Sequence, residues 1–443
     1  MDGEEIIKDK VYHFPASQFD PLNPFSDPVI HIVFSRVTDP WDRDTDGDGY
    51  NDKDDINPID PYRNPVVFLH GWTGNSGVFG IRTNHNNKEE YYNNNFKSEY
   101  NNIGQLYSAC STQKIDFIEE NSLSYYLTKK DYSANRNLFA FNYANEDMVQ
   151  KNAERLSEYI SNLIETAQTE QNSEYVDCDL FFATDADRIS GNVQFDLIGY
   201  SMGGLVARYY TENVDRDGRV RKVIEIDVPN FGSSMADVSL GANLITTSFG
   251  KFNPGTLDLI THGKIFGNNG EQSIWTWRWD TDMVQYAIDN QSNKLNGNQN
   301  LDVKYYAIAG IEARFIHLDS GIGSGLFYKP SSIPNTTVYD IPLLQVTNDF
   351  ENELDNQLGY YYSDNYEMSN VIPVFTFNDG VVDVESQLGL QFNSNGILQE
   401  KLNFEKQTLI IDNTSGHFFA SPYHTDICNY DQCVRKIKEY LYD

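Results

Sequence analysis

The sequence predicts an α/β protein with a mostly parallel central sheet, helices on both faces and cap-like insertions. Short runs of β-branched and aromatic residues alternate along the chain with segments in which apolar residues recur at helical spacing. The apolar runs are continuous rather than alternating, as expected for strands that are buried on both faces. Two long aromatic-rich stretches interrupt this rhythm and therefore look like insertions.

The expected elements follow one another from residue 66 onward. The run at 66–69 lies between Pro65 and a His-Gly pair, which is typical of a buried strand that ends in a tight loop. A second strand is expected at 138–141, and apolar residues at helical spacing predict an amphipathic helix over 152–164. The remaining expected elements are strands at 195–198, 220–228 and 303–308, and helices at 203–213 and 433–442.

We expect two regions in the chain. Residues 1–62 form a loop-rich lead-in with one strand near 29–34 and an Asp/Gly/Asn-rich loop at 42–60, and residues 63–443 form the α/β domain. The two insertions are expected at about 235–300, with three alternating tryptophans, and 312–370, with three consecutive tyrosines. Such segments either cap a substrate cleft or pack as accessory structure, and the sequence leaves both readings open.

Charge and hydropathy exclude several classes of partner. The 65 acidic and 33 basic residues give a net charge of -32, which repels nucleic acid and anionic membranes. The sequence contains no apolar run long enough for a transmembrane segment, and it does not indicate an oligomeric state. The acidic start lacks signal-peptide features, and we expect a secreted protein whose signal peptide precedes this sequence.

Four cysteines, Cys110, Cys178, Cys428 and Cys433, permit two disulfides in three pairings. Cys428 and Cys433 could close a tight loop before the terminal helix. Four free thiols remain the alternative.

The candidate nucleophile is Ser201, in the stretch Gly199-Tyr200-Ser201-Met202-Gly203. Three fixed positions in five residues are a weak signal, but this stretch directly follows an apolar strand and directly precedes a helix. That context is the strand–turn–helix setting that exposes a strained nucleophilic serine. The flanking glycines then leave room for the close approach of the helix to the strand.

An oxyanion hole beside such a serine needs two backbone donors. The N-terminus of the following helix would supply the amide of Met202, and the loop after the strand at 66–69 would supply the amide of Trp72. His70 begins that loop, so we expect it to be structural rather than catalytic.

In four stretches the chain resembles the bacterial secreted lipases and esterases of the α/β-hydrolase superfamily: Pro65–Trp72, Asp196–Tyr209, Val228–Ser234 and Asn378–Val382. They occur in the order of that family and frame residues 65–443, while the insertions are unmatched. Asn230 departs from the histidine usual in the family, at a position that is not catalytic there. The resemblance implies an α/β-hydrolase fold and a Ser-His-Asp triad.

By this resemblance Asp379, in Asn378-Asp379-Gly380-Val381-Val382, is the triad acid, with Asp383 as its rival. The base follows the acid in the chain, which leaves His424 and His417. His424 is preferred because its surroundings resemble the segment that carries the family's catalytic histidine. His417 remains the alternative base.

The loop at 44–55 matches the spacing rule for a calcium loop. Oxygen ligands at positions 1, 3, 5, 9 and 12 and glycine at position 6 suit a hard cation with six to eight oxygen ligands. The predicted ligands are Asp44, Asp46, Asp48, Tyr50, Asp52 and Asp55. The loop resembles thrombospondin type 3 and dockerin repeats, and a solvated acidic linker is the alternative. A structural calcium ion would be the cofactor.

The expected activity is that of a carboxylic ester hydrolase that works through an acyl-enzyme, with triacylglycerol as the preferred lipid substrate. A polyesterase or a short-chain esterase is the alternative enzyme. An inactive, calcium-dependent surface-binding protein on a hydrolase scaffold is the alternative from another class.

Overall fold

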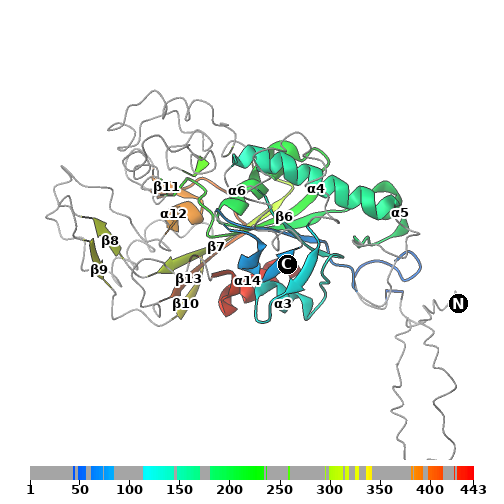
Figure 1. The fold of residues 1–443 in the computed structure, drawn as a ribbon, viewed down its shortest axis with the longest axis horizontal. Coiled ribbons are helices and arrows are strands. Elements are labelled where there is room, and N and C mark those ends of the chain that lie inside the picture. The colour runs from blue at the N-terminus through cyan, green and yellow to red at the C-terminus, as the bar shows by residue number, and fades with distance from the viewer. Residues whose placement is uncertain are drawn as a thin grey trace, which may run out of the picture. The chain divides into compact units, whose positions relative to one another are not determined.

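The structure is a computed structural model, and its parts are shown in Figure 1. It describes residues 43–44, 48–55, 61–72, 74–83, 113–143, 147–169, 180–233, 236, 258–259, 295, 299–312, 315–318, 325–328, 336–341, 381–382, 384–392, 398–412, 424 and 427–443. The chain divides into two compact units, one of residues 1–63 with 181–193 and one of residues 64–180 with 194–443. The return of 181–193 to the first unit is not visible in the local sequence pattern, because it is a contact between distant segments.

The described part of the first unit is built around the predicted calcium loop. Asp55 forms an antiparallel bridge with Thr184, and Thr184 caps helix α5 (Asp185–Ser190) by accepting from the Asp187 amide at 3.1 Å. The ring of Tyr62 packs against Phe181 with the centroids 5.5 Å apart. The strand expected at 29–34 lies outside the described residues.

The second unit contains a mostly parallel sheet of seven strands in the described residues, in the order β10-β13-β7-β6-β5-β1-β4. Every neighbouring pair is parallel except β10 with β13. The strands are β1 (Val66–Leu69), β4 (Leu138–Phe141), β5 (Phe195–Tyr200), β6 (Val220–Ile226), β7 (Lys304–Glu312), β10 (Thr336–Ile341) and β13 (Lys406–Asp412). The predicted α/β class with a mostly parallel central sheet is confirmed.

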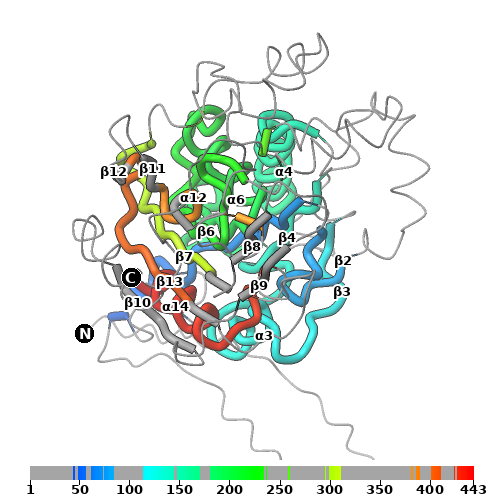
Figure 2. The backbone as a smooth tube through the Cα atoms, turned by 90° about the vertical axis from the view of Figure 1, so that its left-hand side faces the viewer, coloured from blue at the N-terminus to red at the C-terminus, as the bar shows by residue number. Residues whose placement is uncertain are grey.

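Helices cover both faces of this sheet (Figure 2). Helices α4 (Val149–Thr169) and α6 (Met202–Tyr209) lie on one face, and α3 (Leu123–Thr128) and α14 (Asp431–Tyr442) lie on the other. The predicted helix over 203–213 is α6 continued by a π-helical turn, η3 (Tyr210–Val214). The shorter elements are η2 (Ser76–Phe79), β2 (Ile81–Thr83), β3 (Ile115–Ile118), β8 (Phe315–Leu318), β9 (Gly325–Tyr328), α12 (Val384–Gln387), β11 (Leu390–Phe392), β12 (Leu398–Glu400) and η5 (Ile427–Asn429).

The terminal helix α14 is fixed to the sheet by a buried lysine. Lys222 of β6 donates from Nζ to the carbonyl oxygens of Tyr440 and Leu441, at 2.7 and 3.1 Å. These carbonyls lie at the helix C-terminus, where a cation is favoured. Cys428 and Cys433 are both buried and no disulfide joins them, and Cys110 and Cys178 lie outside the described residues.

The second predicted insertion is not wholly separate from the sheet. Residues 336–341, which fall within the expected 312–370 insertion, form β10 and pair with β13 as an antiparallel edge strand. The alternating run Thr337-Val338-Tyr339 suits an edge strand, whereas the aromatic content of the segment left a cap and packed accessory structure equally open. Most of both predicted insertions lies outside the described residues.

One residue of the first insertion, Asp258, supports the start of α4. It is 1% exposed, and its Oδ2 accepts from the Val149 amide at 2.7 Å. Burial raises the pKa of this carboxyl from its ordinary 3.8 to about 7.

Because its pKa is raised by folding, Asp258 makes the folded protein bind more protons than the unfolded chain between these two values. The free energy of unfolding should therefore fall as pH rises from about 4 to about 7. Asp258→Asn should match the wild type near pH 4 and exceed its stability at pH 8 by as much as about 4 kcal/mol. Urea unfolding at both pH values measures this difference. Asp217→Asn is the control, because the Asp217 side chain is mostly exposed. An equal stability difference at both pH values would contradict it.

Candidate active site

The sharp turn between β5 and α6 carries Ser201 at the carboxyl edge of the sheet. Its backbone has a φ of 52° and a ψ of -127°, a conformation that residues other than glycine rarely adopt. The turn is held because the Ser201 amide donates to the Ile226 carbonyl at 2.9 Å. The Gly204 amide donates to the Ser201 carbonyl at 3.0 Å. These hydrogen bonds therefore hold Ser201 in its strained backbone conformation.

The glycines around Ser201 are required by close approach. A Cβ on Gly203 would lie 2.2 Å from the Leu69 carbonyl oxygen, and one on Gly199 would lie 2.4 Å from the Gly204 Cα. A Cβ on Gly71 would lie 2.8 Å from the Cβ of Ser201. The loop after β1 and the turn after β5 are thus in contact beside the hydroxyl.

This contact brings the segments of both predicted oxyanion donors together. Met202 is the first residue of α6, where amides have no partner within the helix, and Trp72 follows Gly71 in the neighbouring loop. His70 is 1% exposed, its Nδ1 lies 2.9 Å from the Gly71 carbonyl oxygen, and its Nε2 accepts from the Tyr143 amide at 3.2 Å. Both ring nitrogens of His70 are engaged in supporting the loop.

His424 lies directly beside the candidate nucleophile. Its Nε2 is 3.3 Å from the Ser201 Oγ, and both residues are buried. The hydroxyl of Tyr200 donates to the His424 carbonyl oxygen, and the two rings are 5.1 Å apart between centroids. The residue before the serine therefore positions the backbone of the histidine, in a contact that the sequence does not reveal.

A carboxylate that sequence reasoning missed faces the other side of the His424 ring. Asp227 directly follows β6, is fully buried, and its Oδ2 lies 3.7 Å from the His424 Nδ1. The predicted strand over 220–228 ends at Ile226, because Asp227 has a φ of 49° that breaks the extended conformation. An aspartate directly after an apolar strand, between Ser201 and His424 in the chain, was the available signal.

The predicted acid Asp379, its rival Asp383 and the alternative base His417 lie outside the described residues. The segment after Asp379 is nevertheless anchored near Asp227. Ser233 Oγ donates to the Val381 carbonyl at 2.5 Å, and Gln387 of α12 donates to the Val382 carbonyl at 2.8 Å. Asp379 therefore stays a prediction.

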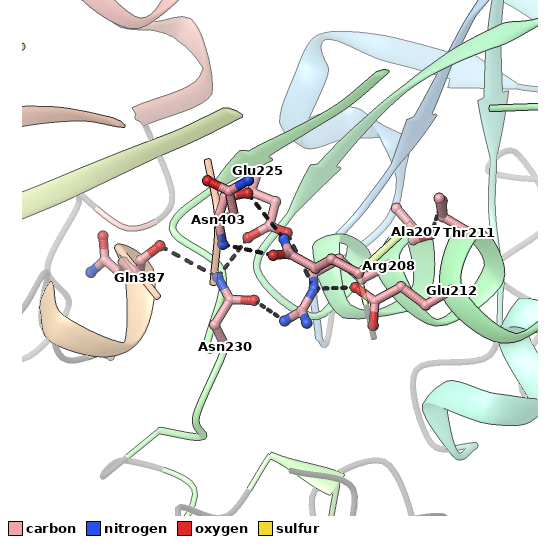
Figure 3. Close-up of polar contacts among 9 residues, drawn as sticks. Ala207, Arg208, Thr211, Glu212, Glu225, Asn230, Gln387 and Asn403 are labelled. Atoms are coloured by element: carbon pink, nitrogen blue, oxygen red, sulfur yellow. Dashed lines mark hydrogen bonds and ion pairs between the residues drawn. The ribbon is translucent and has the colours of Figure 1, made fainter. Parts of the chain in front are cut away.

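A buried polar cluster, formed by Arg208, Glu212, Glu225 and Asn230, joins α6 to β6 (Figure 3). Arg208 donates from Nε to Glu212 Oε1 at 3.0 Å and from Nη1 to Asn230 Oδ1 at 2.6 Å. Asn230 in turn donates to Glu225 Oε2 at 2.5 Å. Burial raises the pKa of Glu225 to about 7, against the opposing effect of Arg208. Asn230 is thus a structural link here, consistent with a position that is not catalytic.

The predicted calcium loop is only partly described. Asp44 accepts from the amides of Asp48 and Gly49 at 3.0 and 2.9 Å, and Asp48 accepts from the Tyr50 and Tyr62 amides at 2.9 and 2.6 Å. Within the described part of the chain no three histidine, cysteine or carboxylate side chains gather as a metal site would require, and Asp46 lies outside it. The side chains of Asp52 and Asp55 are in the described part and do not complete such a group. The prediction of a calcium site therefore still rests on the spacing of the ligand residues in the sequence.

Comparison with solved structures finds bacterial lipases and esterases at low similarity. The mature form of the Bacillus licheniformis lipase BlEst2 is 15% identical over 86% of this chain and 93% of that one, with a TM-score of 0.35. The propeptide form is 17% identical with a TM-score of 0.36, and there the match covers 86% of this chain and about half, 51%, of that one. The Staphylococcus hyicus lipase is 13% identical over 86% of this chain and 97% of that one, with a TM-score of 0.36.

No protein-family model matches the chain, and no curated protein matches it. Among the helices of the described residues, none is both long and apolar enough to cross a membrane.

Proposed function

We propose that the chain is a serine carboxylic ester hydrolase. The observation that carries the proposal is the strained Ser201 turn, with the Nε2 of His424 3.3 Å from the Ser201 Oγ. A nucleophilic hydroxyl, a base within reach of its proton and a helix N-terminus beside both are the parts that acyl transfer needs. The distance is slightly longer than an ideal hydrogen bond, as is common before substrate binds.

In the proposed reaction His424 Nε2 takes the proton of Ser201 Oγ while Oγ attacks the ester carbonyl carbon. The backbone amides of Met202 and Trp72 donate to the oxyanion that forms. His424 then gives the proton to the departing alcohol, which leaves an acyl-enzyme on Ser201. Water, deprotonated by His424, releases the carboxylic acid. By its resemblance to the lipases, the sequence assigns Asp379 as the acid that orients the His424 ring through Nδ1.

Long-chain glycerides are the proposed substrates, as in the lipases that the sequence resembles. The aromatic insertions support this choice only by composition, since apolar side chains suit an acyl chain. A polyesterase or short-chain esterase would use the same chemistry on a smaller or polymeric ester. We also propose that the enzyme works after export, where calcium is abundant.

Labelling with a fluorophosphonate tests the activity. We expect a covalent adduct on Ser201 in the wild type, and no adduct at this residue would overturn the enzyme proposal in favour of an inactive binding protein. A p-nitrophenyl ester series from two-carbon to sixteen-carbon acyl groups then tests the substrate. Activity confined to the shortest acyl groups would refute the lipase assignment and leave a short-chain esterase.

Calcium binding by the loop at 44–55 is proposed separately, on its ligand spacing. Exhaustive chelation is expected to lower Tm by several degrees. A calcium ion whose free concentration is a hundred times its Kd stabilises the folded protein by about 2.7 kcal/mol, and chelation removes this stabilisation. Asp44→Asn should lose this response, and magnesium in place of calcium should restore little of it. Calorimetry with and without chelator measures both, and an unchanged wild-type Tm after chelation would exclude a structural calcium ion.

A further inference from the structure

Asp227 is a buried carboxylate beside His424 to which the proposed reaction assigns no role. It lies at the end of β6, the strand that pairs in parallel with β5, so it reaches the same sheet edge as Ser201. Its side chain is fully buried. A buried carboxylate is costly unless its oxygens are engaged, and this one sits where a charge would act on the candidate base.

The carboxylate is held rigidly by the neighbouring strand β7. The Gly310 amide donates to Asp227 Oδ1 at 2.6 Å, and the Asp227 amide donates to the Ile308 carbonyl at 2.9 Å. The Gly310 amide is also 2.8 Å from Gln387 Oε1, so α12 braces the same point. Aspartate tolerates the positive φ of this position better than most residues do.

With Oδ1 engaged in this way, the second oxygen faces the imidazole. Oδ2 lies 3.7 Å from His424 Nδ1, while Nε2 of the same ring lies 3.3 Å from Ser201 Oγ. The imidazole thus stands between the serine hydroxyl and the carboxylate. A shortening of less than 1 Å would make the Nδ1 contact a hydrogen bond, and such contacts tighten when substrate binds.

We infer that Asp227 is the carboxylate that orients His424 and stabilises its imidazolium during acyl transfer, in place of the sequence-predicted Asp379. This inference rests on the proposed ester hydrolase function. The required chain order of serine, acid and histidine holds for Asp227 as it does for Asp379. Asp227 acts through His424 and does not touch substrate, so it is a positioning residue.

Cys433 of α14 is also close to this carboxylate. Burial, and next the charge of Asp227, raises the pKa of the Cys433 thiol well above its ordinary range. The thiol therefore stays protonated beside Asp227 and adds no second negative charge near His424.

Asp227→Asn and Asp379→Asn are the informative variants, each compared with the wild type on one p-nitrophenyl ester. Asparagine keeps an acceptor for the Gly310 amide and tolerates the positive φ, but it no longer favours the donor tautomer at Nδ1. We expect Asp227→Asn to lower kcat about 10²- to 10⁴-fold with KM within about twofold. Fluorophosphonate labelling of Ser201 should slow in proportion. Asp379→Asn should keep kcat within about tenfold of the wild type.

Glu225→Gln is the matched control, because Glu225 is an equally buried carboxylate two residues earlier in the chain, within β6, and belongs to the structural cluster. It should change Tm but leave kcat. An Asp227→Asn kcat within threefold of the wild type overturns the inference. A folded Asp379→Asn variant whose kcat falls more than about a thousandfold also overturns the inference. This second test can be made even if Asp227→Asn does not fold. A wild type that neither turns over nor labels would instead refute the proposed function.

Discussion

Replacing Ser201 with alanine is expected to lower kcat for any ester substrate about 10⁴- to 10⁶-fold, because the acyl-enzyme can then no longer form. The change removes one oxygen from a turn whose shape is set by backbone hydrogen bonds to Ile226 and Gly204, so folding should be preserved. Stopped assays with purified variants and Tm measurements check both parts. Ser190→Ala, at the exposed end of α5, is the control and should keep full activity.

His424→Ala should cause a loss of similar size, and the double variant should be no worse than either single variant. Residues that act as one unit show such non-additive losses, because each single change already disables the unit. Multiplying effects in the double variant would contradict the interpretation of the 3.3 Å contact between Ser201 and His424 as a nucleophile–base pair.

Gly203→Ala is expected to destabilise the fold by about 3 kcal/mol or more. The added Cβ would meet the carbonyl oxygens of Leu69 and His70 at 2.2 and 2.5 Å, and both belong to backbone that β1 and its loop hold in place. In the interior of most helices a glycine-to-alanine change increases stability. A decrease in the free energy of unfolding at Gly203 would therefore report the close packing of α6 on β1. Urea unfolding at constant m-value gives the difference.

Gly218→Ala is the matched control for this second prediction. Gly218 has a φ of 66° but open space around it, so alanine there meets backbone strain without collision and should cost only about 1 kcal/mol. If Gly203→Ala proves no more destabilising than Gly218→Ala, the packing of the turn against the first strand is looser than these contacts require.

The sequence by itself determined the elements whose signal is local. Continuous apolar runs predicted β1 and β4, and shorter apolar stretches predicted β5, β6 and β7, because a strand buried on both faces is mostly apolar. The strand–serine–helix context located the Ser201 turn, since the glycines that permit it are adjacent in the chain. Chain order and local resemblance also selected His424, which the structure places beside Ser201.

Only the tertiary structure decided the contacts between segments that are distant in the chain. The addition of β10 to the sheet and the joining of 181–193 to the first unit depend on which long-range pairing buries the most surface, and no local period encodes that choice. The same holds for Asp227: in the sequence it is one aspartate among many acidic residues. Parallel pairing of β5, β6 and β7 carries it to the edge that Ser201 occupies, where burial and the Gly310 amide aim it at His424.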